Sequence, residues 1–173
     1  MLMPRDRNPA AFSLVEIIIV ILVLAIAAAI VIPSIGSADD SQAVSAASIL
    51  QGDLEVARSM AMTTQRPHSV VFSPDLQSYK VVANYAGGAY GWAVAVNHPV
   101  NAGKRFEVRL GRMSGMGDVR VTAVNFGGLT YVTFLALGDP SAAGSVRIEA
   151  GHVVMTVSVE ALTGIVAAVR TAG

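Results

Sequence analysis

The stretch FSLVEIIIVILVLAIAAAIVI spans residues 12–32, and Glu16 is its one ionisable side chain. At about 1.5 Å per residue a helix of this length is roughly 31 Å long, close to the hydrocarbon thickness of a bilayer. The run therefore predicts a membrane helix. Its borders add information, because it follows the polar leader MLMPRDRNPAA and is followed directly by Pro33.

The leader carries Arg5 and Arg7 against a single acidic residue, Asp6. Positive charge beside an apolar segment tends to remain in the cytoplasm, so we expect the rest of the chain to be exported. A secretory signal peptide would have its small-residue cleavage site after a shorter apolar region. Here the small pair Ala10-Ala11 comes before the apolar run, which argues against an ordinary signal peptide.

The composition favours one exported head domain held together by packing. The chain has 173 residues, 53% of them hydrophobic, and its 12 basic and 12 acidic residues cancel. Residues 34–173 are equally balanced, so no overall field draws this part toward nucleic acid or anionic lipid. The chain contains no cysteine, so disulfides cannot contribute.

A second helix is expected over residues 34–66, with a kink or break at Pro33 and Gly36 where the chain leaves the first helix. Apolar residues there recur at spacings of three and four, which predicts one narrow buried stripe. We expect this helix to run to about Thr64 and to end before Pro67. The stripe consists of Val44, Ala47, Leu50, Leu54, Ala57 and Ala61.

After Pro67 the pattern changes to a period of two, in short runs rich in Val, Phe, Tyr and Thr between turn residues. This pattern is typical of antiparallel strands joined by hairpins. We therefore expect an α+β fold, in which a long N-terminal helix packs on a C-terminal antiparallel β-sheet head. The expected strands are 68–73, 78–84, 92–97, 105–110, 119–125, 130–135, 145–149, 153–160 and 165–170.

The leader, Ala11 and the residues FSLVE at 12–16 resemble the prepilin signature of type IV pilins and type II secretion pseudopilins. The resemblance implies that a membrane peptidase cuts between Ala11 and Phe12 and methylates the new amino group of Phe12. Ala11 stands where the family usually has glycine. Pro33 stands where the family commonly has a proline. The long helix would then serve as membrane anchor and, after assembly, as filament core.

Glu16 has two interpretations. A carboxylate inside a bilayer costs about 2.5–3.5 kcal/mol on insertion scales, so it usually marks a function or a partner. The family resemblance supplies a partner, the free amino group of Phe12 in a neighbouring subunit, which would guide assembly. Alternatively, Glu16 extends to the headgroups and favours the helix N-terminus.

Further segments resemble the minor pseudopilin H and FimT-type group. Residues 55–61 read EVARSMA, residues 131–134 read YVTF, residues 145–148 read SVRI, and the last hairpin is expected to turn at Thr163 and Gly164. The implied function is a minor pseudopilin of a type II secretion pseudopilus. The alternative is a FimT-like type IV minor pilin that acts in pilus assembly or DNA uptake.

The resemblance also implies a layout and a set of partners. Residues 1–11 would be the leader, 12–33 the transmembrane and filament-core helix, 34–66 the amphipathic helix, and 67–173 the periplasmic β-rich head. The protein would cross the bacterial inner membrane once, with its N-terminus in the cytoplasm. Its partners would be prepilin peptidase, other pseudopilins or pilins, and secreted cargo or the outer-membrane secretin.

The residues that could support catalysis or metal binding are scattered. His68, His98 and His152 stand far apart in the sequence, without a cysteine or an i, i+4 partner. No nucleophile-elbow or phosphate-loop motif occurs. We therefore expect no catalytic residue, no metal and no cofactor.

One basic cluster stands out between residues 104 and 120. Alternation along a strand would place Arg105 and Arg109 on one face and the apolar residues between them on the other. This face is either simply solvated or contacts DNA phosphates or an acidic neighbouring subunit. FimT-type pilins bind DNA through a basic C-terminal region, whereas residues 163–173 here hold only Arg170. The cluster consists of Lys104, Arg105, Arg109, Arg112 and Arg120.

Overall fold

The computed structural model describes residues 13–31 and 37–171. The chain divides into two compact units, Met1–Ser37 and Ala38–Gly173, which are described separately. The expected leader, the cleavage point between Ala11 and Phe12, and Pro33 all lie outside the described residues.

The first unit contains helix α1, Leu14–Val31. The helix begins where the carbonyl of Ser13 accepts the backbone N–H groups of Glu16 and Ile17, at 3.0 and 3.2 Å. No helix within residues 13–31 and 37–171 meets the length and apolarity that a membrane crossing requires. The expected membrane span covered residues 12–33, so α1 is shorter than that span at both ends.

The second unit is built on helix α2, Ser37–Thr64. The expected stripe is buried at Ala47, Leu50, Leu54, Ala57 and Ala61. The expectation was wrong at Val44, which is 46% exposed, because the helix turns Ala43 and Ala46 toward the sheets instead. Alanine at these positions lets the backbone of α2 approach the sheets closely.

Helix α2 ends as the sequence predicts, at Thr64. Gln65 adopts a positive φ of 54°, and the backbone N–H of Arg66 donates to the carbonyl of Ala61 at 3.2 Å. This six-to-one hydrogen bond around a left-handed residue satisfies a helix-end carbonyl. Pro67 then directs the chain into an extended conformation.

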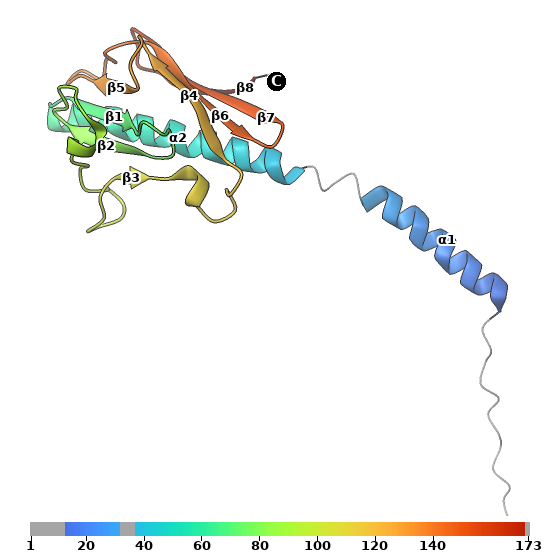
Figure 1. Cartoon of the computed structure of the whole chain (residues 1–173). Coiled ribbons are helices and arrows are strands. Elements are labelled where there is room, and N and C mark those ends of the chain that lie inside the picture. The colour runs from blue at the N-terminus through green and yellow to red at the C-terminus, as the bar shows by residue number, and fades with distance from the viewer. Residues whose placement is uncertain (1–12, 32–36, 172–173) are drawn as a thin grey trace, which may run out of the picture. The chain divides into compact units, whose positions relative to one another are not determined.

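Two four-stranded antiparallel sheets complete this unit (Figure 1). The first sheet has the order β3-β2-β1-β5 and the second the order β4-β6-β7-β8. This arrangement confirms the expected α+β architecture. The strands are β1 His68–Phe72, β2 Tyr79–Ala83, β3 Glu107–Val108, β4 Arg120–Phe126, β5 Tyr131–Phe134, β6 Gly144–Ala150, β7 Val153–Val159 and β8 Val166–Thr171.

Two expected strands differ from the structure. Residues 92–97 form only isolated bridges at Ala95 and Asn97, after a 3-10 turn, Tyr90–Trp92. Within residues 105–110 only β3 is a strand, because a second 3-10 turn, Leu110–Arg112, follows directly. Alternation alone did not reveal these turns, since the side chains of Phe106 and Leu110 are still buried on the inner side.

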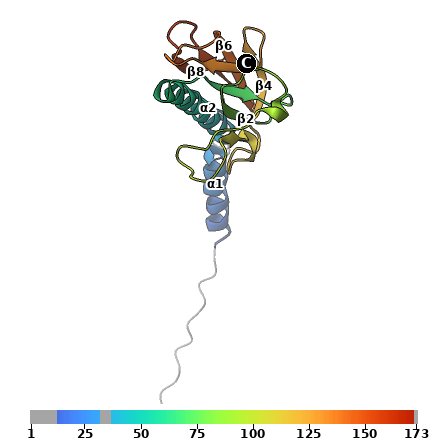
Figure 2. The ribbon, with the colours of Figure 1, turned by 90° about the vertical axis from the view of Figure 1, so that its left-hand side faces the viewer.

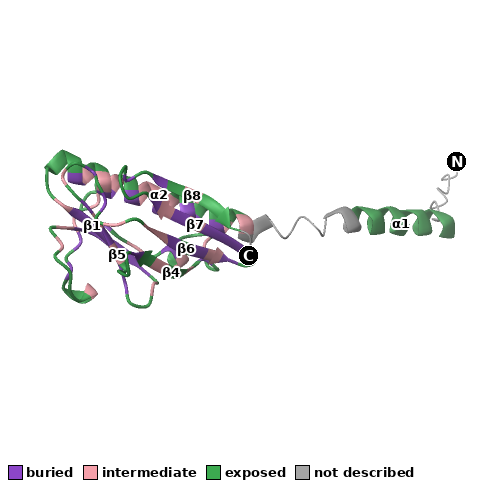
Figure 3. Cartoon of the chain, turned by 90° about the horizontal axis from the view of Figure 1, so that it is seen from above, coloured by how far each residue is buried: buried purple, intermediate pink, exposed green. Residues whose placement is uncertain are grey.

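The core lies between α2 and the two sheets. Buried residues of α2 belong to one cluster with those of β1, β2 and β5 and of β6 and β7. Helix α2 also lies beside the edge strand β8, where the amide of Gln51 donates to the carbonyl of Val166 at 3.0 Å (Figure 2). In Figure 3 the buried residues concentrate on the strands and on one side of α2. The helix thus fixes both sheets against each other.

Arg58, from the EVARSMA segment, connects α2 to two turns of the sheets. Its Nε donates to the carbonyl of Gly138 at 3.1 Å. Gly164 has a φ of +63°, and a Cβ added there would lie 2.7 Å from the Gly138 carbonyl and 3.1 Å from Arg58 Nε. Glycine is favoured at position 164, because both the backbone conformation and the close contacts disfavour a side chain.

Candidate functional site

The first candidate site is the N-terminal turn of α1. Glu16 lies in this first turn, where a negative charge is favoured by the helix dipole. Its side chain is exposed, and among the described residues its carboxylate has no hydrogen bond or ion pair. The carboxylate is therefore available to a partner outside this chain.

The rest of α1 is equally exposed. Every side chain described in the helix, from Leu14 to Ala27, is exposed, and apolar residues occur on all sides of it (Figure 3). Leu14 is 74% and Leu24 62% exposed. A helix that is hydrophobic all round is stable when lipid or other protein covers it.

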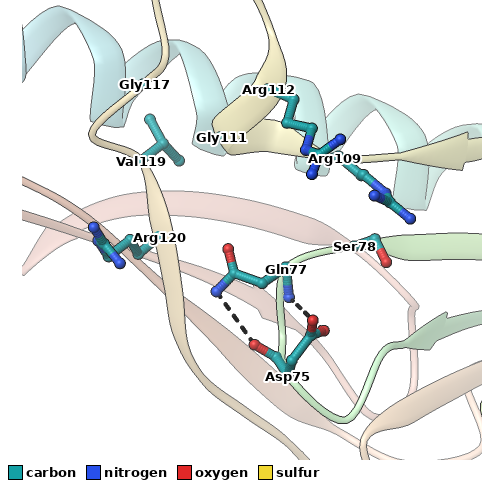
Figure 4. Close-up of a pocket in the computed structure, with 9 residues that line it drawn as sticks. All are labelled: Asp75, Gln77, Ser78, Arg109, Gly111, Arg112, Gly117, Val119 and Arg120. Carbon is teal, nitrogen blue, oxygen red and sulfur yellow. Dashed lines mark hydrogen bonds between the residues drawn. The ribbon is translucent and has the colours of Figure 1, made fainter.

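The second candidate site is a cavity of about 350 Å³ in the second unit (Figure 4). Three of the five basic residues of the predicted cluster line it: Arg109, Arg112 and Arg120. We call this cavity the arginine cavity. Its other lining residues are Asp75, Gln77, Ser78, Gly111, Gly117 and Val119.

The β1–β2 connection forms one wall of the arginine cavity. Asp75 stabilises this turn, because its Oδ1 accepts the Ser73 hydroxyl at 2.6 Å and the backbone N–H of Gln77 at 3.1 Å. Leu76, between them, has a positive φ of 56°. The turn therefore presents Gln77 and Ser78 to the cavity in a defined conformation.

The other lining residues come from the 3-10 turn after β3, from the segment that follows this turn and from the start of β4. Arg109 precedes the turn, Arg112 ends it, and Arg120 is the first residue of β4. The two segments approach closely at Gly111, where an added Cβ would lie 2.9 Å from the carbonyl of Val119. The absence of a side chain at Gly111 thus allows the three arginines to share one cavity.

The charges around the arginine cavity are unequally paired. Arg109 lies 3.7 Å from Glu107, a pair in which both side chains are well exposed. The hydrogen bond from the Ser73 hydroxyl lowers the pKa of Asp75, assisted by the Gln77 N–H and the charge of Arg109. Among the described residues, Arg112 and Arg120 make no hydrogen bond or ion pair through their side chains.

The other two residues of the predicted cluster do not line the cavity. Nη1 of Arg105 donates to the carbonyl of Ala95 at 3.0 Å, which ties together the loop before β3. Lys104 is exposed. Arg170, the single basic residue near the C-terminus, pairs with Asp40 at 3.3 Å.

Sequence reasoning missed the polar pair of Asp53 and Tyr79. The buried hydroxyl of Tyr79 donates to Oδ2 of Asp53 at 2.6 Å and so connects α2 to β2. Burial raises the pKa of Asp53, partly offset by this hydrogen bond, and burial also raises the pKa of Tyr79 well above its usual value. Position 53 lies off the apolar stripe, so no sequence pattern identified it as a core contact.

The histidines have separate local surroundings. Nδ1 of His68 lies 2.9 Å from the carbonyl of Arg66, and the ring of His98 stacks on Phe106 with centroids 4.5 Å apart. Within residues 13–31 and 37–171 no group of three or more histidine or acidic side chains is placed to hold a metal ion.

Comparison with protein families gives two matches. Residues 46–163 match the family described as type II transport protein GspH. Residues 6–32 match the prokaryotic N-terminal methylation motif. Curated proteins gave no significant match. The GspH match covers most of the second unit, and the methylation motif covers residues 6–11 of the leader and α1.

Two solved structures share the fold. The type IV minor pilin FimU of Pseudomonas aeruginosa (strain PAO1) aligns with a TM-score of 0.53 and 16% identity, over 74% of this chain and 88% of that one. The minor pseudopilin EpsH from the type 2 secretion system of Vibrio cholerae aligns with a TM-score of 0.52 and 10% identity, over 76% of this chain and 97% of that one. These likenesses confirm the expected pilin-like α+β fold.

Proposed function

Because the chain belongs to the family of the type II transport protein GspH and is thus a minor pseudopilin of type II secretion, we propose that it enters a filament through its N-terminal helix. Members of this family are structural pseudopilin subunits, and the family is not known as an enzyme family. The methylation-motif match over residues 6–32 implies processing by prepilin peptidase and assembly with other pilins.

The observation that carries the proposal is the exposure of α1. Apart from Glu16, its described side chains are apolar and exposed, and a helix that is apolar on every side needs cover by lipid or by other protein. Before assembly, the segment of residues 12–33, which extends beyond α1 at both ends, anchors the subunit in the inner membrane. After assembly, the helices of neighbouring subunits replace lipid around α1, and it becomes part of the filament core.

Processing depends on Phe12, and the register of assembly depends on Phe12 and Glu16. Prepilin peptidase cuts between Ala11 and Phe12 and methylates the amino group of Phe12. The exposed carboxylate of Glu16 then meets the amino group of Phe12 in a neighbouring subunit. In a low-dielectric surrounding such a pair is strongly favoured over an unpaired carboxylate.

The second unit acts in the periplasm. Helix α2 lies within residues 34–66. Residues 67–173 present the two sheets to neighbouring subunits, secreted cargo or the outer-membrane secretin. The basic residues between 104 and 120 contribute a contact surface there. No cofactor is required for this role, since assembly needs contacts rather than chemistry.

Mass spectrometry of the protein from its native host tests the processing step. We expect a mature chain that begins at a methylated Phe12. A mature chain that still carries the leader would contradict the proposal.

The variant Glu16→Val tests the assembly step. We expect it to be cleaved and retained in the membrane fraction normally, but to be depleted from sheared filaments, because it lacks the carboxylate that pairs with Phe12. Glu16→Asp is the matched control, since it keeps the charge on a shorter side chain and should retain part of the incorporation. Normal incorporation of Glu16→Val would contradict the ion-pair role.

The alternative, a FimT-like minor pilin for DNA uptake, has less support. The family match is to GspH, and the FimU likeness concerns the fold alone. The C-terminal region has a single basic residue, Arg170, which is paired with Asp40. The discriminating observation is the set of neighbouring genes, which would encode either a secretion system or a pilus.

A further inference from the structure

The arginine cavity contains more positive charge than its surroundings neutralise. Arg112 and Arg120 line it without a side-chain partner among the described residues, while Arg109 has only the exposed Glu107 at 3.7 Å. Asp75 is the acidic residue of the lining, and its carboxylate already accepts hydrogen bonds from Ser73 and Gln77. The cavity is therefore suited to an anion from outside the chain.

The size and donors of the cavity define the chemical class of that anion. A volume of about 350 Å³ lies at the lower end of the range of roughly 300–1,000 Å³ typical of ligand sites, so it accepts a group of side-chain size. Guanidinium groups bind carboxylates through paired, parallel hydrogen bonds. Gln77 and Ser78 line the same space, and both side chains already have partners: the Gln77 amide donates to the carbonyl of Asp75 at 3.3 Å, and the Ser78 hydroxyl lies 3.0 Å from the Tyr90 hydroxyl.

We propose that the arginine cavity binds a glutamate or aspartate side chain from an acidic segment of a partner protein. The occupant inserts its carboxylate into the cavity, where the arginines of the lining supply charge-assisted hydrogen bonds, and the polar β1–β2 turn faces the rest of the segment. The site belongs to the second unit and is separate from the N-terminal helix. It therefore serves recognition of a partner rather than formation of the filament core.

A protein carboxylate fits the site better than nucleic acid does. Residues 34–173 carry as many acidic as basic residues, so they lack the general positive field that draws DNA to a protein. A side-chain carboxylate needs only local charge-assisted hydrogen bonds, which the arginines of the lining can supply without a general positive field.

The test titrates the full-length chain, purified in detergent, with a hexaglutamate peptide and follows the arginine Nε–H signals by NMR. We expect saturable shifts at Arg112 and Arg120 and none with hexaglutamine. The double variant Arg112→Gln, Arg120→Gln should bind about tenfold more weakly, since it loses two charge-assisted contacts. The double variant Arg66→Gln, Lys104→Gln is the matched control, because it removes the same charge from exposed residues outside the cavity.

A variant whose new side chain fills the cavity gives an independent test that keeps every arginine. A Cβ added at Gly117 meets no atom within 4 Å, so Gly117→Leu should fold normally and occupy the cavity. We expect it to weaken hexaglutamate binding, with an unchanged near-ultraviolet circular dichroism spectrum. Equal weakening in both double variants would overturn the proposal, because binding would then follow net charge alone. Tighter binding of a single-stranded oligonucleotide to the same arginines would also overturn the proposal. Full displacement of the peptide by an equal concentration of inorganic phosphate would overturn it as well.

Discussion

Replacing Tyr79 by phenylalanine should weaken the attachment of α2 to the first sheet. The change removes the hydroxyl that donates to Asp53 at 2.6 Å and keeps the buried ring, which is 1% exposed. A hydrogen bond to a charged group contributes about 1.5–3 kcal/mol. Asp53 is half-buried, so we expect Tyr79→Phe to lower the free energy of unfolding by about 2 kcal/mol at pH 7.

The assay is thermal and urea unfolding of the full-length chain, followed by near-ultraviolet circular dichroism. All tyrosines and the single tryptophan lie in residues 79–131, so this signal reports the second unit without interference from α1. For a unit of this size, 2 kcal/mol corresponds to a decrease in Tm of about 8 °C. Tyr85→Phe is the matched control, because its hydroxyl donates to the carbonyl of Gly88 on an exposed loop.

The cost of Tyr79→Phe should also depend on pH. Burial raises the pKa of Asp53 above its usual 3.8, so between that value and the raised pKa the folded state binds more protons than the unfolded state. Stability therefore falls as pH rises through this window, and Asp53→Asn should abolish that fall. Tyr79→Phe removes a bond that favours the ionised carboxylate, so its cost should be largest above the window and smaller below it. A cost that is equal at both ends of the window, or no larger than that of Tyr85→Phe, would refute this reasoning.

Three further substitutions test the packing of the second unit by the same unfolding measurement. Gly144→Ala should lower the free energy of unfolding by about 3 kcal/mol or abolish folding, because the added Cβ would overlap backbone and ring atoms of β4. A decrease of less than about 1 kcal/mol would show that β4 and β6 can move apart. Leu54→Ala should lower the free energy of unfolding by about 2–5 kcal/mol, because Leu54 is fully buried. Val44→Ala should lower it by less than about 1 kcal/mol, because Val44 is exposed. Similar losses in the two variants would contradict the assigned face of α2. Gly164→Ala should cost about 1–3 kcal/mol, because it strains a positive φ and pushes against the Gly138 carbonyl. Gly115→Ala is the control, since its φ of +77° is similar but its added Cβ meets no atom within 4 Å, and it should cost less.

The helices could be predicted well because their signals are local. The apolar run of residues 12–32 indicated the first helix, and the three-to-four spacing of Leu50, Leu54 and Ala57 indicated the second and its buried face. The end of α2 at Thr64 followed from Pro67. The leader and the residues around Glu16 indicated the family, since the motif is a short continuous sequence.

The strands could be predicted where alternation continues over several residues. In β6, Val146, Ile148 and Ala150 are buried in strict alternation, as expected for a sheet with one covered face. The same rule failed between residues 92 and 112, where Phe106 and Leu110 are buried from a loop and a 3-10 turn. Burial of alternate residues does not require strand pairing, which depends on where the neighbouring chain lies.

The sequence by itself determined the apolar first helix, the amphipathic second helix, the antiparallel β-rich unit and the family. It also identified the basic cluster between residues 104 and 120. Only the tertiary structure divided that cluster, bringing Arg109, Arg112 and Arg120 around one cavity with Gln77 from another turn. The tertiary structure likewise joined Asp53 to Tyr79 across 26 residues. The reason is physical: helical and strand periodicity depend on neighbours along the chain, whereas a cavity and a buried hydrogen bond depend on how separate elements pack.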